Sequence, residues 1–356
     1  MTDEREPLAP PATPARGGLR GLLGALRRAL GGAPRGTSPA AVRAALEREL
    51  DAVLHGLRAY ERLAADEDGN RFLLRRNTHR LEKGLLMRPR REVFARDYIE
   101  ETVEVYARLL GRRGERAADP EELRWTHDVL EEYFSVIGAA PEIERARERF
   151  ADLAPLDAPA GARPSHPYRR DLDGPPPVAY EDFLALARRR RSVRWFRPEP
   201  VPRELVDRAL VAAFEAPSAC NRQPFEFRVV DDPHRVERVS AIARGTRGFA
   251  HNIPTLVVVV GQLRAFFHPR DRHVIYIDAS LAAMGFMLAL ETVGLSSCPI
   301  NWPDVAERER RMARVLDLAP DERPVMLLAV GYPDPEGAVA CSQKQSLERL
   351  RAYDRP

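Results

Sequence analysis

The sequence predicts an all-helical region followed by a sheet-containing domain of the α/β or α+β class. From Thr37 to about Asp152, apolar residues recur at helical spacing and no strand pattern interrupts them. A proline-rich stretch at residues 156–178 then has the composition of a linker. Beyond it, helical patterns alternate with β-rich runs, "FEFRVV", "TLVVVVG", "SSCPINW" and "PVMLLAVGY". We therefore divide the chain into residues 1–37, 38–155, 156–178 and 179–356.

Composition narrows the classes of function. The 356 residues are 44% hydrophobic and 31% charged, which is typical of a globular protein. With 56 basic against 53 acidic residues, the net charge is only +3, so we do not expect a nucleic-acid partner. Three cysteines that lie far apart suit a reducing cytoplasm and form neither a disulfide framework nor a zinc pattern. No stretch approaches the ~20 apolar residues of a membrane span, and the acidic start "MTDERE" does not resemble a secretory signal.

Residues 1–37 have the composition of a disordered basic tail, rich in Pro, Gly, Ala and Arg. Within them, "GLRGLLGALRRAL" places leucines on one helical stripe and arginines off it, as in a helix lying on an anionic membrane surface. Its glycines would each weaken such a helix by ~1 kcal/mol. We favour the tail over membrane-surface contact through residues 16–30.

The helical region starts with a clear boundary signal. "TSPAAVRAALERELDAVLHGLRAYERL" opens on a cap residue and a proline in the first turn, and then keeps a helical spacing. Similar runs follow at "DYIEETVEVYARLL" and "DPEELRWTHDVLEEYF". In the last of these, His127 and Glu131 lie one turn apart. Since no second pair accompanies them, we favour a solvated helix face over a metal site.

A strongly basic segment lies at residues 71–91. Within it, "RRNTHRLEKGLLMRPRR" surrounds three leucines with seven cations, including Lys83, one of only two lysines in the chain. An amphipathic helix with a charged outer face is the favoured interpretation. The alternative is a basic flap that helps to bind an anionic substrate or cofactor.

Common cofactor and catalytic motifs are absent from the sequence. There is no G-x-G-x-x-G after a strand, no G-x-x-x-x-G-K-[ST], no H-E-x-x-H and no G-x-S-x-G. Five weaker motifs occur instead, in a fixed order. They are "RRRRSVRWF" (188–196), "APSACNRQPFEF" (216–227), "RGFAHNIPTLVVVVG" (247–261), "YIDASLAAMGFMLALETVGLSSCPINW" (276–302), and "AVGYPDPE" with "CSQKQSLERL" beyond it (329–350).

This ordered set resembles the nitroreductase family of FMN-dependent oxidoreductases, over about residues 180–356. The resemblance implies an α+β fold whose central, mostly antiparallel sheet is flanked by helices. It also implies an intertwined homodimer with FMN at the subunit interfaces. The helical half looks like an extension found in longer members, some of them loosely associated with surface-polysaccharide gene sets.

The resemblance also implies site residues. Arg190, Arg191 and Ser192 fall where the family binds the FMN phosphate and ribityl chain. Arg194 falls beside the flavin N1/O2 edge, where a cation stabilises the negative charge of reduced flavin. Lys344 matches a basic residue that closes over the phosphate, although Ser342 stands where a second one is often found.

Two further groups would contact the flavin ring. The first, from the other subunit, would be a wall of small and amide residues: Pro217, Ser218, Asn221 and Gln223. The second would be the backbone near flavin N5: Pro299, Ile300 and Asn301. A turn held by local side-chain hydrogen bonds is the alternative explanation of the first group. Either Arg247 or Asn252 could bond the flavin pyrimidine.

We expect a flavin enzyme with neither a catalytic side chain nor a metal. NADH or NADPH would deliver hydride to flavin N5, and a nitro compound, quinone or enone would then take the electrons in a ping-pong reaction. One alternative is a flavin-dependent oxidase or dehydrogenase acting on a biosynthetic intermediate, for example of a surface polysaccharide. The other is a non-catalytic flavin-binding scaffold.

Overall fold

The computed structural model describes residues 38–65, 69–112, 118–154, 156 and 163–354. The expectations for residues 1–37, including membrane contact through 16–30, lie outside the described residues. By its contacts the chain divides into residues 1–49 and 50–356. The sheet and the helices from Leu50 onward therefore belong to one unit.

The N-terminal half is helical, as the sequence predicted. Its helices are α2 (Pro39–Ala65), α3 (Arg71–Leu86), α4 (Ile99–Gly111), α5 (Pro120–Val136) and α6 (Pro141–Ala151). The predicted start of α2 is confirmed: the Ser38 hydroxyl accepts a hydrogen bond from the Ala41 amide at 3.1 Å, and Pro39 follows. Helices α3 to α6 bury a shared core that includes Leu74, Ile99, Tyr106, Leu130 and Ile143.

The expectation that His127 lies on a solvated helix face is wrong. This side chain is half-buried, its Nδ1 lies 3.1 Å from the Tyr106 hydroxyl, and its ring packs against Tyr106 and Phe150. A buried tyrosine hydroxyl needs a hydrogen-bond partner, and His127 supplies one. In the part of the chain that the structure describes, no three His, Cys, Asp or Glu residues are grouped so that they could hold a metal ion.

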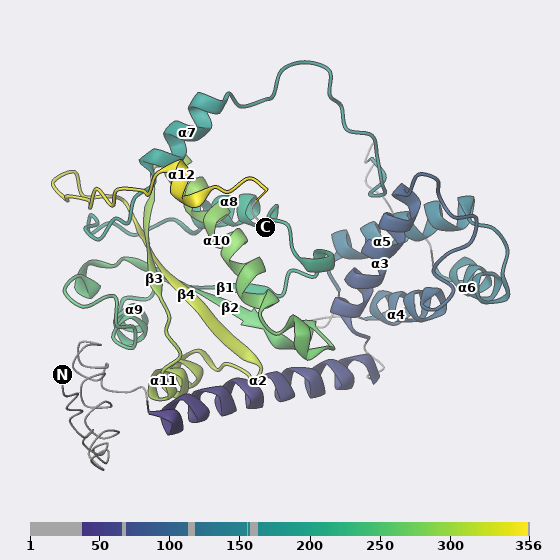
Figure 1. The fold of residues 1–356 in the computed structure, drawn as a ribbon, viewed down its shortest axis with the longest axis horizontal. Helices are drawn as coiled ribbons and strands as arrows, with labels where there is room; N and C mark the ends of the chain where they lie inside the picture. Colours follow the sequence, from purple (N-terminus) through teal and green to yellow (C-terminus); the bar gives the residue numbers. More distant parts are fainter. Residues whose placement is uncertain (1–37, 66–68, 113–117, 155, 157–162, 355–356) are drawn as a thin grey trace, which may run out of the picture. The chain divides into compact units, whose positions relative to one another are not determined.

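The second half contains one four-stranded sheet (Figure 1). Its strands are β1 (Phe225–Val230), β2 (Thr255–Gln262), β3 (Ser296–Asn301) and β4 (Glu322–Gly331), in the order β1-β2-β4-β3. All three pairings are antiparallel. All four β-rich runs are thus strands, and the predicted α+β class is confirmed.

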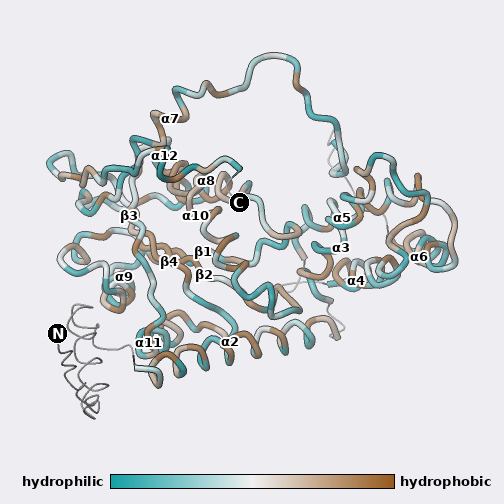
Figure 2. The backbone as a smooth tube through the Cα atoms, viewed as in Figure 1, coloured by the Kyte–Doolittle hydropathy of each residue, from teal (hydrophilic) through white to brown (hydrophobic). Residues whose placement is uncertain are grey.

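Helices cover both faces of this sheet because its central strands are apolar on both sides. On β2, Val257 and Val259 pack against α8 (Arg203–Phe214) and α10 (Val274–Thr292). The alternating Val258 and Val260 pack with α9 (Pro233–Ser240) and α11 (Ala306–Leu316). Figure 2 shows the hydrophobic colouring of β2 and β4. Two short helices complete the half, α7 (Tyr180–Arg189) and α12 (Leu347–Leu350).

Helix α10 is the central helix of this half. The stretch Pro269–Thr292 is long and apolar enough to cross a membrane, judged by length and composition only. The statement that no stretch approaches such a span is therefore wrong. The helix nevertheless buries residues from Ile275 to Glu291 within the chain, largely against the sheet and α8. A central core helix passes the same test, because it is apolar on every face.

A small apolar cluster joins helices of the first half to the sheet-containing half. It includes Val53 of α2, Phe72 of α3, and Leu263, Phe266 and Ile275 near the end of β2 and the start of α10. Gly56 permits this approach, because a Cβ atom there would lie 2.6 Å from the Cβ of Leu263. The helical extension therefore packs on the sheet-containing half through apolar surface.

Candidate functional site

The segment that follows α7 runs between the ends of two strands. Its first part lies beside β3, where the Val193 amide donates to the Ser297 carbonyl at 3.0 Å. Its last part lies beside the end of β4, where the Arg197 amide donates to the Tyr332 carbonyl at 2.9 Å. These bonds hold residues 190–194 next to the strand that carries Pro299, Ile300 and Asn301.

A cavity of about 110 Å³ lies against this segment. Its lining comes from two distant parts of the chain and consists of Arg190, Arg191, Ser192, Arg194, Ala340, Ser342 and Lys344. The lining holds four cations and two hydroxyls but no carboxylate. Arg190 Nε is buried and, among the described residues, has no hydrogen-bond partner. Since a buried unpaired donor is costly, this cavity suits a small anion such as a phosphate group.

A buried carboxylate fixes the helix that precedes these cations. Glu291, near the end of α10, forms an ion pair with Arg189 at 3.2 Å and accepts a hydrogen bond from the Ser296 hydroxyl at 2.9 Å. Burial raises the pKa of Glu291 above its ordinary value, although Ser296 and Arg189 oppose that shift. Because Arg189 carries this ion pair, the next arginines along the chain remain available to the cavity.

At the end of β3 the three predicted residues differ in exposure. Ile300 is buried in the core, and its Cγ2 would lie 3.0 Å from a Cβ atom placed on Gly245. Pro299 is half-buried and Asn301 is exposed. The contact of this backbone with a flavin ring stays a prediction.

The turn that carries Pro217, Ser218, Asn221 and Gln223 is strained and braced by side chains. Cys220, Asn221 and Gln223 have φ angles of 53°, 51° and 48°, in a region that non-glycine residues seldom occupy. The Ser218 hydroxyl accepts from the Gln223 amide at 3.0 Å, and buried Asp278 of α10 accepts from the Ala219 amide at 2.9 Å. Local side-chain hydrogen bonds, the alternative considered from the sequence, are therefore present.

Arg75 of α3 is a further brace, which the sequence analysis missed. Its Nε donates to the Asn221 carbonyl at 2.6 Å and its Nη2 donates to Gln223 Oε1 at 2.9 Å. Its Nη1 lies 3.4 Å from Glu122, which is buried in the helical half. The favoured interpretation of this segment as a charged outer face is wrong for Arg75, whose side chain is only 15% exposed. No local pattern in the sequence marks its side chain as buried.

One chain does not bring the two groups of predicted residues together. Asp278 binds the strained turn and Glu291 binds the segment of the cation-lined cavity, and both belong to α10. Thirteen residues separate them, which is roughly 20 Å along a helix that rises 1.5 Å per residue. The structure groups Arg190, Arg191, Ser192, Arg194 and Lys344, with the end of β3 beside them, and holds the turn elsewhere.

Of the two candidates for the pyrimidine contact, Asn252 is already engaged. Both of its amide hydrogens donate to backbone carbonyls, of Arg194 at 3.0 Å and Phe249 at 3.1 Å, and its oxygen accepts from the Phe196 amide at 2.9 Å. Asn252 therefore fixes the shape of the segment beside the cavity. Arg247 is exposed and is the one of the two with a donor to offer.

Comparison with known proteins decides the family. A family model described as "Nitroreductase family" matches residues 187–246 and 234–332. An NADH dehydrogenase of Thermus thermophilus is 30% identical over 200 residues, which cover 48% of this chain and 94% of that protein. The chain belongs to the nitroreductase family. This family comprises flavin oxidoreductases, and the matched residues lie in the sheet-containing half.

Other relatives carry different names. Iodotyrosine deiodinase 1 of Sus scrofa is 28% identical over 201 residues, covering 48% of this nitroreductase-family chain and 68% of the pig protein. Among solved structures, an FMN-dependent nitroreductase from Clostridium difficile R20291 is 24% identical and covers 48% of this chain and 99% of its own, with a TM-score of 0.42.

Proposed function

We propose that this chain binds FMN and catalyses the reduction of an organic acceptor by NADH or NADPH. The observation that carries the proposal is the cavity of four cations without a carboxylate, beside the end of β3, in a chain of the nitroreductase family. The cavity volume of about 110 Å³ fits a phosphate group and not a flavin ring, so only the phosphate end of FMN would lie there.

Each residue of this site has a physical role in the proposal. Arg190, Arg191 and Lys344 would bind the phosphate by charge-assisted hydrogen bonds, and Ser192 would add a hydroxyl. Arg194 is an exposed member of the lining, so its guanidinium would extend beyond the phosphate to the N1/O2 edge and favour the reduced, anionic state. When bound, the flavin would accept hydride at N5 and pass two electrons to a nitro compound, quinone or enone bound at the same face.

We also propose that the working unit is a homodimer. The strained turn and the segment of the cation-lined cavity are attached to α10 at points roughly 20 Å apart, and no residue of the turn lines the cavity. In a symmetric dimer, the turn of one chain could cover the ring bound by its partner. Separate, unpaired cysteines are consistent with a reducing, cytoplasmic location, which we retain as part of the proposal.

A second candidate reaction is the reductive removal of iodine from an iodotyrosine. The observation that favours it is the group of relatives named iodotyrosine deiodinase, one of them 30% identical over 174 residues. That reaction would also draw two electrons from a reduced flavin, so the two candidates differ in acceptor and not in cofactor. Oxidation of a biosynthetic intermediate and a non-catalytic scaffold stay as the remaining alternatives.

The first experiment is an absorbance spectrum of the purified protein, followed by anaerobic addition of NADH and then NADPH. Flavin bands near ~370 and ~450 nm that bleach support the proposal. The reduced protein is then offered a nitroaromatic, a quinone, an enone and 3-iodotyrosine, and reoxidation identifies the acceptor class. A colourless protein that takes up no FMN would overturn the proposal in favour of a scaffold.

Matched variants test the phosphate site. Arg190→Ala and Ser192→Ala should purify without FMN, with the far-ultraviolet circular dichroism of the parent. The control is Arg188→Ala, because Arg188 is an exposed neighbour outside the cavity lining and its loss changes the charge equally. If both cavity variants retain stoichiometric FMN, the assignment of the phosphate site is wrong.

A further inference from the structure

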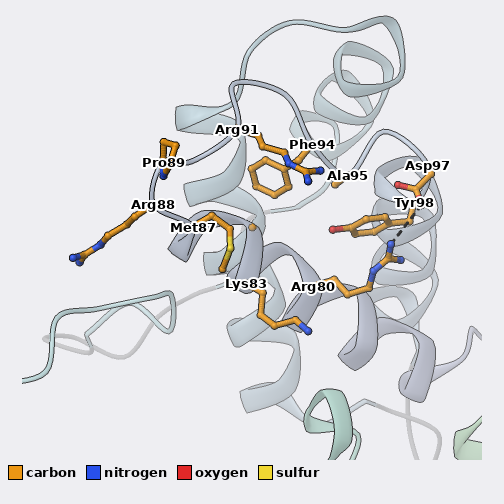
Figure 3. Close-up of a pocket in the computed structure, with 11 residues that line it drawn as sticks. Arg80, Lys83, Met87, Arg88, Pro89, Arg91, Phe94, Ala95, Asp97 and Tyr98 are labelled. Atoms are coloured by element: carbon orange, nitrogen blue, oxygen red, sulfur yellow. Dashed lines mark hydrogen bonds and ion pairs between the residues drawn. The ribbon is translucent and has the colours of Figure 1, made fainter. Parts of the chain in front are cut away.

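The helical half contains a cavity of about 580 Å³ of its own (Figure 3). It lies between the end of α3, the loop at residues 87–97 and the start of α4. Its lining consists of Arg80, Lys83, Gly84, Met87, Arg88, Pro89, Arg91, Phe94, Ala95, Asp97 and Tyr98. We call it the helical-half pocket. It shares no residue with the cation-lined cavity, and Lys83 lies eight residues, roughly 12 Å, beyond Arg75 along α3.

This pocket has an excess of unpaired positive charge. Its four cations face a single carboxylate, Asp97, which lies 3.4 Å from Arg80. Within the described part of the chain, the side chains of Lys83, Arg88 and Arg91 form no hydrogen bond or ion pair. In Figure 3, Lys83 and Arg91 lie on either side of the pocket, whereas Arg88 extends away from it. Lys83 and Arg91 are therefore the cations that a bound anion would meet.

The rest of the pocket wall is apolar and held in place. The ring of Phe94 packs on Gly84 so closely that a Cβ atom there would lie 2.1 Å from Phe94 Cε2. Tyr133 fixes Phe94 from behind, with an edge-on ring contact at 5.1 Å and a hydrogen bond from its hydroxyl to the Phe94 carbonyl at 2.7 Å. Met87 is 52% exposed and adds a flexible apolar side chain to the pocket wall.

Tyr98 forms the opposite wall and is also fixed. It precedes α4, is buried, and carries the Arg80 guanidinium 3.6 Å above its ring centroid. Burial raises the pKa of Tyr98 to about 12. Its hydroxyl therefore stays protonated near neutral pH and can donate a hydrogen bond to an acceptor in the pocket.

We propose that the helical-half pocket binds a small amphipathic anion, with an apolar ring or short chain between Phe94, Tyr98 and Met87 and an acidic group between Lys83 and Arg91. A volume of about 580 Å³ lies within the range of small-molecule sites. Because the wall is partly apolar and partly cationic, it favours a ligand that has both an apolar part and an acidic group. A carboxylate and a phosphate share this chemistry. The proposal does not depend on flavin binding.

Calorimetric titration of the full-length protein, with and without added FMN, tests the proposal. The probes are 3-phenylpropionate, phenyl phosphate, inorganic phosphate and the neutral 3-phenylpropanol. At least one of the two aromatic anions should bind below ~1 mM, at least tenfold more tightly than inorganic phosphate and the alcohol. A preference between the two identifies the acidic group as a carboxylate or a phosphate.

Variants locate the binding. The double variant Lys83→Ala/Arg91→Ala should weaken binding of the aromatic anion at least tenfold, and the single variant Met87→Ala should weaken it less. The control Arg58→Ala/Arg62→Ala removes two exposed charges of α2 and should leave it unchanged. Arg190→Ala tests for binding at the cation-lined cavity and should also leave it unchanged. The proposal is overturned if neither aromatic anion binds, if inorganic phosphate binds equally well, or if the control or Arg190→Ala weakens binding as much as the pocket variant.

Discussion

Replacing Arg75 by methionine should destabilise the protein in a way that depends on pH. Methionine keeps much of the length and the apolar stem but removes both hydrogen bonds to the turn, to the Asn221 carbonyl and to Gln223 Oε1. It also removes the ion pair with Glu122. The turn would then lose the brace that opposes its strained backbone.

The magnitude follows from burial. Hydrogen bonds that involve a charged group contribute about 1.5–3 kcal/mol each, and contributions within one network do not add. Removing one partner of a buried ion pair costs about 3–5 kcal/mol, because the other charge is left behind. Since the Arg75 side chain is 15% exposed, we expect a loss of about 3 kcal/mol in the free energy of unfolding near neutral pH.

The pH dependence comes from Glu122. Burial raises the pKa of this carboxyl above its ordinary value of 4.5, while Arg75 and then Arg71 lower it. A folded-state pKa above the unfolded one means that the folded state binds the proton more tightly. The contribution of Glu122 to stability therefore falls as pH rises from 4.5 through the folded pKa. Without Arg75 that pKa rises further, so the variant should lose more stability at pH 8 than at pH 5.

The assay is urea denaturation followed by circular dichroism at pH 5, 7 and 8, together with the FMN dissociation constant. Glu122→Gln in the Arg75→Met background removes the orphaned charge, so it should restore part of the stability and flatten the pH profile. Arg75→Lys should be intermediate, because one ammonium cannot reproduce two hydrogen bonds of fixed direction. A loss below ~1 kcal/mol at pH 8, with FMN affinity unchanged, would refute the bracing role.

Two further predictions concern helix α10. Gly261→Ala on β2 would place a Cβ atom 2.9 Å from the Cβ of Ile275, so the midpoint of urea denaturation should drop by an amount equivalent to about 1–3 kcal/mol. Gly111→Ala, with nothing within 4 Å, is the control and should cost nothing. Asp278→Ala should cost about 1–3 kcal/mol, because it leaves the Ala219 amide without its acceptor. Burial raises the pKa of Asp278 above 3.8, so the wild-type contribution falls as pH rises through the folded pKa. Asp278→Asn keeps an acceptor, and its stability relative to wild type should therefore improve with rising pH in that window.

Strands and helices were largely predictable from the sequence because their patterns are local. The run from Leu256 to Val260 is apolar at every position, which is typical of a strand buried on both faces, and β2 is such a strand. Ser38 and Pro39 marked the start of α2 correctly. A local pattern could not show which face of α3 is buried, so Arg75 was placed on the wrong side.

The candidate site was predictable only in part. The order of motifs indicated that Arg190 and Lys344 would be neighbours, and they line one cavity. The left-handed backbone at Cys220 and Gln223 could not be predicted, since neither residue type favours it and contacts from distant segments hold it in place. The distance between the turn and the cavity was equally hidden, because it depends on which residues of α10 each one binds.

Helix α10 fixes both the distance between Asp278 and Glu291 and the angle between their side chains around the helix axis. One carboxylate at each end, Asp278 and Glu291, binds a separate segment of the chain. Substitutions between them would leave both carboxylates in place. An inserted or deleted residue would shift one end by about 1.5 Å and turn it by about 100°, taking one carboxylate out of reach of its partner. A change in the number of residues between Asp278 and Glu291 would therefore break one of these two attachments, whereas a change in the length of a loop need not.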